Sequence, residues 1–330
     1  MTPSTMVSAF AEDVRHYLQL TPRQLPSMYL YDALGSALFD AICELPWYAI
    51  TRAEMLLLER HRTEIFAHLP DLTRLVELGP GDGRKLKTLV DGTSEPLIAH
   101  LVDVSAGALE RAAHTLSDAL NLSVVTHQAP FEDGLDAIMR VEDDAFGRVE
   151  DDTIMRQESG DRTLVLFLGS NIGNFDQRGS ATLLSRIAAS LAPGDAFLIG
   201  ADLVKPEPDL QLAYDDPLGV SAAFNLNVLL RINRELGGNF DLRAFRHRAV
   251  WNAACSRMDM FLVSTREQRV RIEGVGLDFT LREGEGIWSE SSYKYTPDGF
   301  VKQLRDSGFE SMAQWTDRDA GFALTLARTA

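Results

Sequence analysis

Leu75-Val-Glu-Leu-Gly-Pro-Gly-Asp-Gly83 is the stretch that most strongly constrains the fold of this 330-residue chain. An apolar run leads into three alternating glycines, Gly79, Gly81 and Gly83, and a helix-like segment follows over residues 84–90. Glycine permits a sharp turn after a strand and lets a ligand approach the main-chain amides closely. The stretch therefore predicts a strand, a ligand-binding turn and a helix. The alternative, for the glycines alone, is a turn without a ligand.

Two acidic residues stand at informative distances from these glycines. Glu77 precedes the first glycine by two residues, and Asp103, in Ala99-His-Leu-Val-Asp-Val104, follows the loop by about twenty. A carboxylate at the tip of the next strand can accept hydrogen bonds from ribose hydroxyls. A dinucleotide fingerprint has its third glycine three residues after the second, whereas these glycines alternate. The spacing resembles that of S-adenosylmethionine-dependent methyltransferases with a Rossmann-like fold and disfavours a dinucleotide oxidoreductase.

Composition narrows the classes of partner. Hydrophobic residues make up 45% of the chain and charged residues 24%, which is typical of a globular protein with a proper core. The net charge of −16 disfavours a nucleic-acid partner, because phosphate binding needs clustered lysine and arginine. Cys43 and Cys255 are far apart and form no CxxC motif, so neither a disulfide framework nor a metal site is predicted.

The ends and the hydropathy of the chain suggest where it works. Residues 1–12 lack a basic region followed by an apolar core, so they do not resemble a signal peptide. No apolar run approaches the ~18 residues that a membrane span needs. We therefore expect a cytoplasmic protein without a membrane partner. We also expect it to be a monomer and to act on a small molecule.

Strands and helices alternate between residues 75 and 200, which predicts an α/β fold with a parallel, doubly wound sheet. The predicted strands are 75–78, 100–104, 123–126, 163–168 and 196–199, and the clearest helices are 106–120 and 179–191. A further helix, 296–307, precedes two strand-like runs, 309–315 and 321–327. This closing hairpin suits a methyltransferase sheet, in which the last strand inserts antiparallel to the others.

Two regions do not fit this sheet. Residues 1–52 look helical and aromatic-rich, and residues 201–291 interrupt the sheet between its fifth strand and its last helix. We interpret them as one substrate-binding lobe made from an N-terminal segment and an insertion. Residues 53–200 and 292–330 would then form the domain that binds S-adenosylmethionine.

An acidic stretch lies between Arg140 and Arg162, where Val-Glu-Asp-Asp occurs at 141–144 and again at 149–152. Such a density of charge is typical of a solvated surface loop, and the alternative is a functional acidic patch.

Several further segments carry a recognisable pattern. They are Tyr31-Asp-Ala-Leu-Gly-Ser-Ala-Leu-Phe-Asp40, Leu45-Pro-Trp-Tyr-Ala-Ile-Thr-Arg-Ala-Glu54, Phe167-Leu-Gly-Ser-Asn-Ile-Gly-Asn174, Asp202-Leu-Val-Lys205, Ala213-Tyr-Asp-Asp216, Phe224-Asn-x-Asn-Val-Leu229, Asn233-Arg-Glu-Leu236, Phe240-Asp-Leu242 and Ser289-Glu-Ser-Ser-Tyr-Lys294. Together they resemble the histidine Nα-methyltransferases of ergothioneine biosynthesis, from about residue 28 to the C-terminus. The resemblance implies a two-lobe fold and trimethylation of the α-amine of L-histidine to hercynine, through mono- and dimethyl intermediates.

The resemblance also implies where S-adenosylmethionine binds. It assigns cofactor contacts to Gly79, Lys85 and Asp103, beside Glu77 and Gly81 of the glycine loop.

One part of the cofactor site departs from the family. The family has an acid followed by phenylalanine, but this chain reads Pro130-Phe131. Pro130 has no carboxylate to accept from the adenine amino group, so Glu132, Asp133 or the main chain would replace it.

For the amino-acid end of the substrate, the resemblance implies that Asn174 and Tyr214 hold the α-carboxylate and amine region. The backbone around Gly169 and Asn171 would face the amine, with Tyr31 nearby. The sequence contains no Ser-His-Asp set and no lysine nucleophile, so positioning should supply most of the acceleration. Tyr31 or a water molecule would carry away the proton.

For the imidazole end, the resemblance implies that Tyr48, Glu290 and Ser292 surround the ring and that Met260 packs beside it. A neutral imidazole offers one donor and one acceptor, which a carboxylate next to a hydroxyl can satisfy. Glu290 and Ser292 are two residues apart on a strand and so point to one face. An indole has a donor but no acceptor, which separates histidine from a tryptophan derivative or another aromatic amine. The remaining alternative is a cofactor-binding scaffold without catalysis.

Overall fold

The computed structural model describes residues 3–93, 95–119, 121–145 and 162–329. The chain divides into two compact units. Unit 1 consists of Met1–Ala49 and Lys205–Tyr293, and unit 2 consists of Ile50–Val204 and Lys294–Ala330. The chain therefore passes from one unit to the other after Ala49, after Val204 and after Tyr293. That one part binds the substrate and the other the cofactor remains a prediction.

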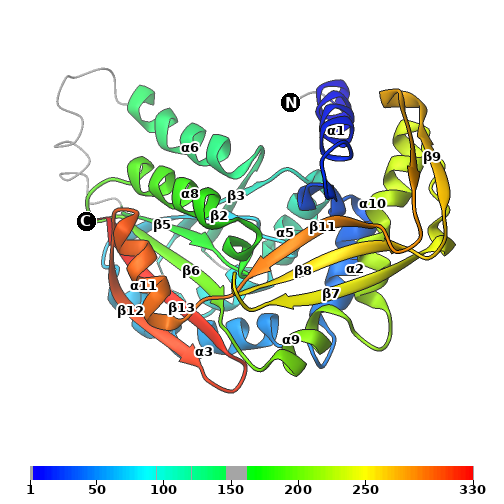
Figure 1. Cartoon of the computed structure of the whole chain (residues 1–330). Helices are drawn as coiled ribbons and strands as arrows, with labels where there is room; N and C mark the ends of the chain where they lie inside the picture. Colours follow the sequence, from blue (N-terminus) through cyan, green and yellow to red (C-terminus); the bar gives the residue numbers. More distant parts are fainter. Residues whose placement is uncertain (1–2, 94, 120, 146–161, 330) are drawn as a thin grey trace. The chain divides into compact units, whose positions relative to one another are not determined.

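Unit 2 is built on a sheet whose described strands follow the order β12-β13-β6-β5-β2-β3-β4 (Figure 1). The strands from β2 to β6 pair in parallel, whereas β13 is antiparallel to both β6 and β12. The strands are β2 (Leu72–Leu78), β3 (Leu97–Asp103), β4 (Leu122–Gln128), β5 (Arg162–Phe167), β6 (Ala196–Asp202), β12 (Phe309–Asp317) and β13 (Phe322–Thr329). The predicted Rossmann-like sheet with an antiparallel closing hairpin is confirmed.

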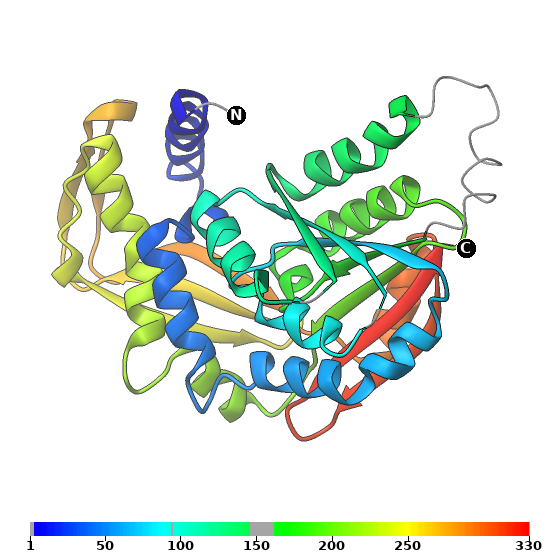
Figure 2. The same ribbon diagram turned by 180° about the vertical axis from the view of Figure 1, so that it is seen from behind.

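Helices cover both faces of this sheet. On one face lie α3 (Ile50–Ala67), α4 (Arg84–Val90) and α5 (Ala106–Leu116), seen in front in Figure 2. On the other lie α6 (Phe131–Ala145), α8 (Gln177–Ser190) and α11 (Pro297–Asp306). The central strands β5 and β6 are buried along nearly their whole length and are mostly apolar, which is why they could be recognised as continuous runs in the sequence.

The starts of three of these helices follow from capping side chains. Ser105 precedes α5, Asp176 precedes α8 and Thr296 precedes α11. Each side-chain oxygen accepts a hydrogen bond from the backbone N–H three residues further on, which satisfies a donor that the first turn leaves free.

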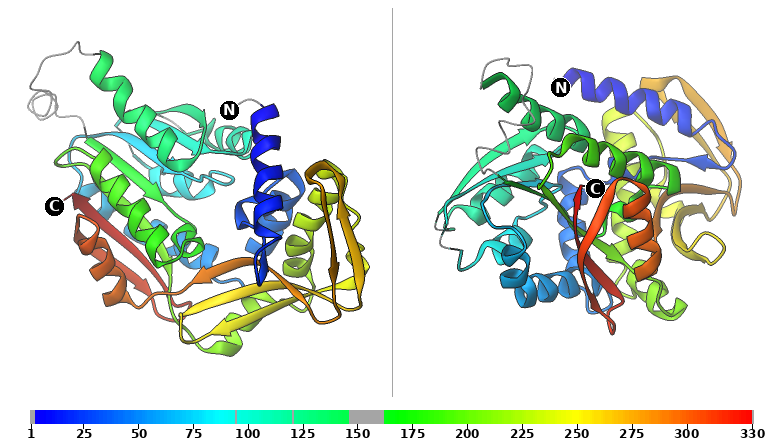
Figure 3. Two further views of the ribbon diagram at one scale, coloured as in Figure 1. Left: turned by 45° about the horizontal axis from the view of Figure 1, so that its top comes forward. Right: turned by 90° about the vertical axis from the view of Figure 1, so that its left-hand side faces the viewer.

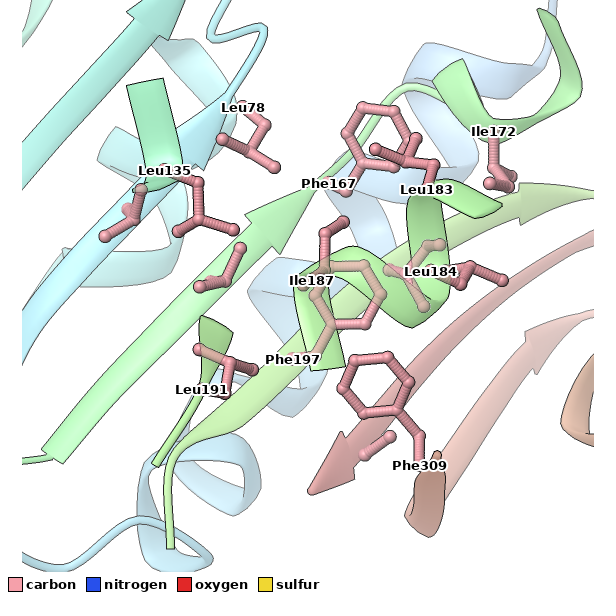
Figure 4. Packing of buried hydrophobic residues seen from close by; sticks show 14 of the residues in the cluster. Leu78, Leu135, Phe167, Ile172, Leu183, Leu184, Ile187, Leu191, Phe197 and Phe309 are labelled. Carbon is pink, nitrogen blue, oxygen red and sulfur yellow. The ribbon is translucent and has the colours of Figure 1, made fainter. Parts of the chain in front are cut away.

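The core of unit 2 lies where β5 and β6 meet α8 (Figure 4). Phe167, Phe197 and Phe309 are fully buried, and the rings of Phe197 and Phe309 stack with their centroids 5.0 Å apart. Leu184 and Ile187 of α8 pack into the same cluster. Burial of each such side chain contributes roughly 1.5–3 kcal/mol, so this cluster fixes the strands whose ends carry the candidate site.

The two ends of the segment 205–293 leave and re-enter unit 2 side by side. Leu203 and Tyr295 form a parallel bridge, the Val204 N–H donates to the Tyr295 carbonyl at 2.9 Å, and the Tyr295 N–H donates to the Asp202 carbonyl at 3.0 Å. An ion pair of 2.9 Å between Asp202 and Lys294, both almost fully buried, fastens the crossing.

Unit 1 contains a second sheet in the order β1-β11-β8-β7 and a two-stranded ribbon, β9–β10, which runs beside α10 (Figure 3). In the sheet, β1 is parallel to β11 and the other pairs are antiparallel. Its elements are α1 (Pro3–Tyr17), β1 (Arg23–Gln24), η1 (Ser27–Leu30), α2 (Ala33–Cys43), α9 (Glu207–Tyr214), α10 (Val220–Leu236), η3 (Leu242–Ala244), β7 (Phe245–Asn252), β8 (Arg257–Ser264), β9 (Gln268–Ile272), η4 (Glu273–Val275), β10 (Leu277–Leu281) and β11 (Gly286–Tyr293).

The expectation for the acidic stretch needs correction. Residues 140–145, including the first Val-Glu-Asp-Asp, continue α6 rather than forming a loop. Residues 140–145 contain neither glycine nor proline, so nothing in them ends a helix. They extend an amphipathic helix that is already established over residues 131–139. The second copy, at 149–152, lies outside the described residues. Of the helices described, none combines the length and apolarity needed to cross a membrane.

Candidate active site

The glycine loop between β2 and α4 has a backbone that suits few residues other than glycine. Gly79, Gly81 and Gly83 have φ angles of 75°, 60° and 79°. A Cβ atom at Gly79 would lie 3.1 Å from Asn171 Nδ2 and 3.3 Å from the ring of Phe131. The loop is thus close to both the start of α6 and the loop that follows β5, and a side chain at Gly79 would crowd that space.

Asp103 lies beside this loop, at the end of β3. The Gly79 N–H donates to the carbonyl of the preceding residue, Val102, at 2.8 Å. The Asp103 side chain is half-buried and accepts from the Ser105 N–H at 2.8 Å. Burial raises the pKa of Asp103, and the hydrogen bonds from the backbone oppose that shift. Asp103 thus stands where a carboxylate could meet the ribose of a nucleoside held by the loop.

Glu77 ends β2 next to the loop and is almost fully buried. Its Oε2 atom has no hydrogen-bond partner among the described residues. Burial raises the pKa of Glu77 to about 8, which Lys85 opposes and Glu54 reinforces. A buried carboxyl oxygen left unsatisfied beside a glycine loop fits a ligand that brings its own hydrogen-bond donor, such as the amino group of S-adenosylmethionine.

Pro130 and Phe131 also lie near the glycine loop, since a Cβ atom at Gly79 would approach the ring of Phe131. Phe131 begins α6, and its ring meets that of Phe167 edge-on with centroids 5.4 Å apart. Pro130 contributes its carbonyl to the Gly134 N–H at 2.9 Å. Glu132 is half-buried in the first turn of α6, and Asp133 next to it is exposed. That one of them, or the main chain, accepts from the adenine amino group in place of the family's acid remains a prediction.

The loop after β5 carries two predicted substrate residues, Gly169 and Asn174. Gly169 and Ser170 both have left-handed backbones, with φ of 79° and 56°. Ser170 is held there because its Oγ accepts from the Asp202 N–H at 2.9 Å. The loop continues into η2 (Asn171–Asn174), which ends at the half-buried Asn174. Consecutive left-handed residues held by tertiary contacts are typical of functional loops.

Lys85 is not the solvated lysine that its position on a helix would suggest. Its ammonium group lies 2.7 Å from a carboxylate oxygen of Glu54, and only 20% of its side chain is exposed. Glu54 was not among the predicted site residues, although it ends the segment Leu45-Pro-Trp-Tyr-Ala-Ile-Thr-Arg-Ala-Glu54 that carries the family resemblance. That segment held the signal that could have identified it.

Unit 1 gathers three predicted substrate tyrosines into a chain of rings. Tyr31 meets Phe39 edge-on at 5.5 Å between centroids, Phe39 meets Tyr48 at 6.2 Å, and Tyr48 meets Tyr214 at 6.2 Å. Phe224 of α10 closes the cluster against Tyr31 and Phe39. Phe39 and Phe224 were not predicted as site residues, yet they set the orientation of the tyrosines.

The end of β11 carries Glu290 and Ser292. Pairing with β8 shifts between Trp288 and Glu290, which makes Ser289 the extra residue of a β-bulge. Beyond the bulge, Glu290 lies opposite Met260 and Ser292 lies opposite Met258, so both belong to one face of the strand.

That face meets α9. The Tyr214 hydroxyl and Ser292 Oγ lie within hydrogen-bond distance, at 2.9 Å, and Tyr214 also packs against the cluster that contains Met260. The structure therefore brings Tyr214, Met260 and Ser292 together within unit 1.

Tyr214 is held by a second contact that the sequence did not predict. His247 Nε2 lies 2.8 Å from the Tyr214 carbonyl, and His247 Nδ1 lies 2.8 Å from the Asn225 amide. Because Asn225 Nδ2 can only donate, His247 Nδ1 accepts and Nε2 carries the proton. The C-terminal end of α9 is thereby fixed to β7.

The predicted site residues thus fall into two groups. Unit 2 holds Gly169, Asn174 and all the predicted cofactor residues, whereas unit 1 holds Tyr31, Tyr48, Tyr214, Met260, Glu290 and Ser292.

Comparisons with known proteins identify the family. The family model described as "Histidine-specific methyltransferase, SAM-dependent" matches residues 10–329. The histidine N-alpha-methyltransferase of Mycolicibacterium smegmatis is 37% identical over 99% of this chain and 97% of its own length. The corresponding protein of Mycobacterium tuberculosis is 37% identical over 97% of this chain and 94% of its own. Ergothioneine biosynthesis protein 1 of Neurospora crassa is 28% identical over 89% of this chain and 32% of its own length. The chain belongs to the histidine-specific methyltransferases, a family of enzymes that depend on S-adenosylmethionine.

Proposed function

We propose that this enzyme transfers three methyl groups to the α-amine of L-histidine, giving hercynine in the first step of ergothioneine biosynthesis. The two mycobacterial relatives are named for histidine Nα-methylation, and the fungal relative for ergothioneine biosynthesis. The observation that carries the proposal is that Glu290 and Ser292, two residues apart on β11, belong to the same face of the strand and that Ser292 contacts Tyr214.

The chemistry of this face suits an imidazole. A carboxylate accepts from the N–H of the ring, and a hydroxyl can donate to the other nitrogen. A side chain without nitrogen would offer this carboxylate no hydrogen-bond donor, and the loss of a hydrogen bond to a charged group costs about 1.5–3 kcal/mol. The face therefore favours histidine over phenylalanine, and over tryptophan, which lacks an acceptor.

Catalysis should come from positioning. S-adenosylmethionine supplies the methyl group when bound. The α-amine must be uncharged to form the new bond, so one proton leaves it in each of three cycles. Asn174 and the backbone around Gly169 would orient the amine, and Tyr31 would pass its proton to solvent. Correct alignment alone can contribute about 7–11 kcal/mol of the barrier.

Mass spectrometry tests the proposal directly. Purified enzyme, S-adenosylmethionine and L-histidine should yield products with one, two and three added methyl groups, with the last accumulating. Nα,Nα-dimethylhistidine should be converted to the same final product. Methylation of tryptophan in preference to histidine would instead support the alternative, an N-methyltransferase of another aromatic amine.

We also propose that the enzyme works as a monomer in the cytoplasm and needs no nucleic acid. The support is the strongly acidic composition, with a net charge of −16. Size-exclusion chromatography with light scattering tests the oligomeric state, and a monomer is expected to have a mass near 36.5 kDa.

A further inference from the structure

Glu54 is a buried carboxylate that joins three elements of unit 2. It lies in the first turns of α3, and none of its side chain is exposed. Its Oε2 lies 2.7 Å from Lys85 Nζ, at the start of α4. Its two oxygens also accept from the Gly169 N–H, at 2.9 and 2.8 Å. One side chain thus ties the helix that follows the glycine loop to the loop that follows β5.

Two glycines, Gly200 and Gly169, lie against the ion pair of Glu54 and Lys85. A Cβ atom at Gly200 of β6 would lie 2.0 Å from Glu54 Oε1, so glycine is needed there for the carboxylate to occupy its place. A Cβ atom at Gly169 would lie 2.8 Å from Lys85 Nζ. Glycines on two elements therefore form the walls of the space that holds this ion pair.

The charge makes this tie rigid. A buried charge is costly unless it is paired and hydrogen-bonded, so neither Glu54 nor Lys85 can leave the other without a large penalty. Weaker neutral contacts would let the two loops shift separately. The Gly169 N–H, committed to Glu54, also fixes the plane of the peptide that precedes Gly169.

We propose that Glu54 is a positioning residue that sets the separation between the glycine loop and the β5 loop, and hence between the methyl donor and the accepting amine. This inference rests on the proposed function, in which the first loop holds the donor and the second faces the amine. A misplacement of about 1 Å can lower turnover 100-fold, so a rigid tie at this point has a direct effect on rate.

The test compares two glutamates of the same helix. Glu54→Gln keeps an acceptor for Gly169 but removes the counter-charge of Lys85. Glu64→Gln is the matched control, because Glu64 also lies on α3 and accepts from Trp315 Nε1 at 2.9 Å, with half of its side chain exposed. We expect Glu54→Gln to lower kcat about 10- to 100-fold and to weaken S-adenosylmethionine binding in calorimetry, with little change in the KM of histidine. Glu64→Gln should change neither kcat nor cofactor affinity.

A double-mutant cycle separates positioning from general stability. Glu54→Gln and Lys85→Met should each weaken cofactor binding, and the double variant should be little worse than either alone. Glu54→Asp, which keeps the charge but shortens the side chain, should fold normally and still lower kcat more than it changes KM. Additive losses, or unchanged cofactor affinity and kcat in folded Glu54 variants, would overturn the proposal. If the wild type fails to methylate histidine, the proposed function is wrong, and the calorimetric cycle still decides the role of Glu54.

Discussion

Unit 2 and unit 1 differ in the polar contacts that surround their predicted ligand-binding side chains. In unit 2, two charged pairs are largely buried, Glu54–Lys85 and Asp202–Lys294. In unit 1, aromatic rings surround hydroxyls, and the central polar contact is the neutral one between Tyr214 and Ser292. Removing one partner of a buried charged pair costs about 3–5 kcal/mol, whereas losing a neutral hydrogen bond such as that between Tyr214 and Ser292 costs about 0.5–1.5 kcal/mol. We therefore expect substitutions to be tolerated less well at the buried charged pairs of unit 2 than at the neutral contact of unit 1.

The largest effect should come from breaking a buried pair of unit 2. Lys294→Met removes the ammonium partner of the buried Asp202 carboxylate, and we expect it to lower the free energy of unfolding by about 3–5 kcal/mol. Lys302→Met is the control, because its partner Asp306 and Lys302 itself are both largely exposed. That change should cost no more than about 1 kcal/mol. Urea denaturation measures both, and equal losses would remove the contrast between buried and exposed pairs.

The next effect concerns specificity in unit 1. Glu290→Ala should lower kcat/KM for histidine by about 2–4 kcal/mol, or roughly 30- to 1,000-fold, because the ring loses a charged partner. Relative activity toward tryptophan and phenylalanine should rise. Glu285→Ala serves as control, since Glu285 forms a partly exposed ion pair with Arg23 just before β11. An unaltered ranking of the three amino acids in Glu290→Ala would exclude Glu290 from the ring-binding face.

The pH dependence of stability tests whether the buried Glu77 of unit 2 titrates near neutral pH. The pKa of Glu77 is about 8 in the folded chain because of burial, against about 4.5 when unfolded. Between these values the folded chain keeps a proton that the unfolded chain has lost, so the contribution of Glu77 to stability falls as pH rises and levels off above 8. The expected slope is about 1.4 kcal/mol per pH unit.

Glu77→Gln removes this titration. The difference in unfolding free energy between wild type and Glu77→Gln, measured in urea from pH 6 to 9, should therefore grow up to pH 8 in favour of the variant. A difference that stays constant over this range would show that Glu77 does not titrate there.

The smallest effect should come from the neutral contact of unit 1. Tyr214→Phe keeps the ring but removes the hydroxyl that meets Ser292, so it should cost about 0.5–1.5 kcal/mol, or roughly 2- to 13-fold in the KM of histidine. Tyr293→Phe is the matched control, because Tyr293 follows Ser292 on β11 and its hydroxyl accepts from Arg257 at 2.7 Å. If the two variants raise the KM equally, Tyr214 acts through the fold and not through the substrate.

The sheet of unit 2 could be predicted because its signals are local. The buried strands β5 and β6 form continuous apolar runs in the sequence, and β2 to β6 all overlap their predicted positions.

The contacts around the site could not be predicted, because they depend on residues far apart in sequence. Glu54 looks like any other acid of a charged helix until Lys85 and Gly169 are placed beside it. The bulge at Ser289 adds one residue to β11 without any glycine or proline to announce it. Asn225 and His247 are 22 residues apart, and only the fold joins them.

The bridge between Leu203 and Tyr295 has a consequence for how this enzyme could diversify. Residues 203 and 295, which flank the insertion, are directly hydrogen-bonded neighbours. For the backbone of unit 2, the whole insertion therefore connects two adjacent points, as a tight turn would. The closure entropy of a flexible loop rises only slowly with its length, so the number of residues between Val204 and Lys294 adds little closure cost for unit 2, provided that the pairing of β11 with β1 in unit 1 is kept. Grafting the corresponding segment of another family member between Val204 and Lys294 should therefore leave the register of β6 and β13 intact, which makes this crossing a natural junction for chimeric methyltransferases.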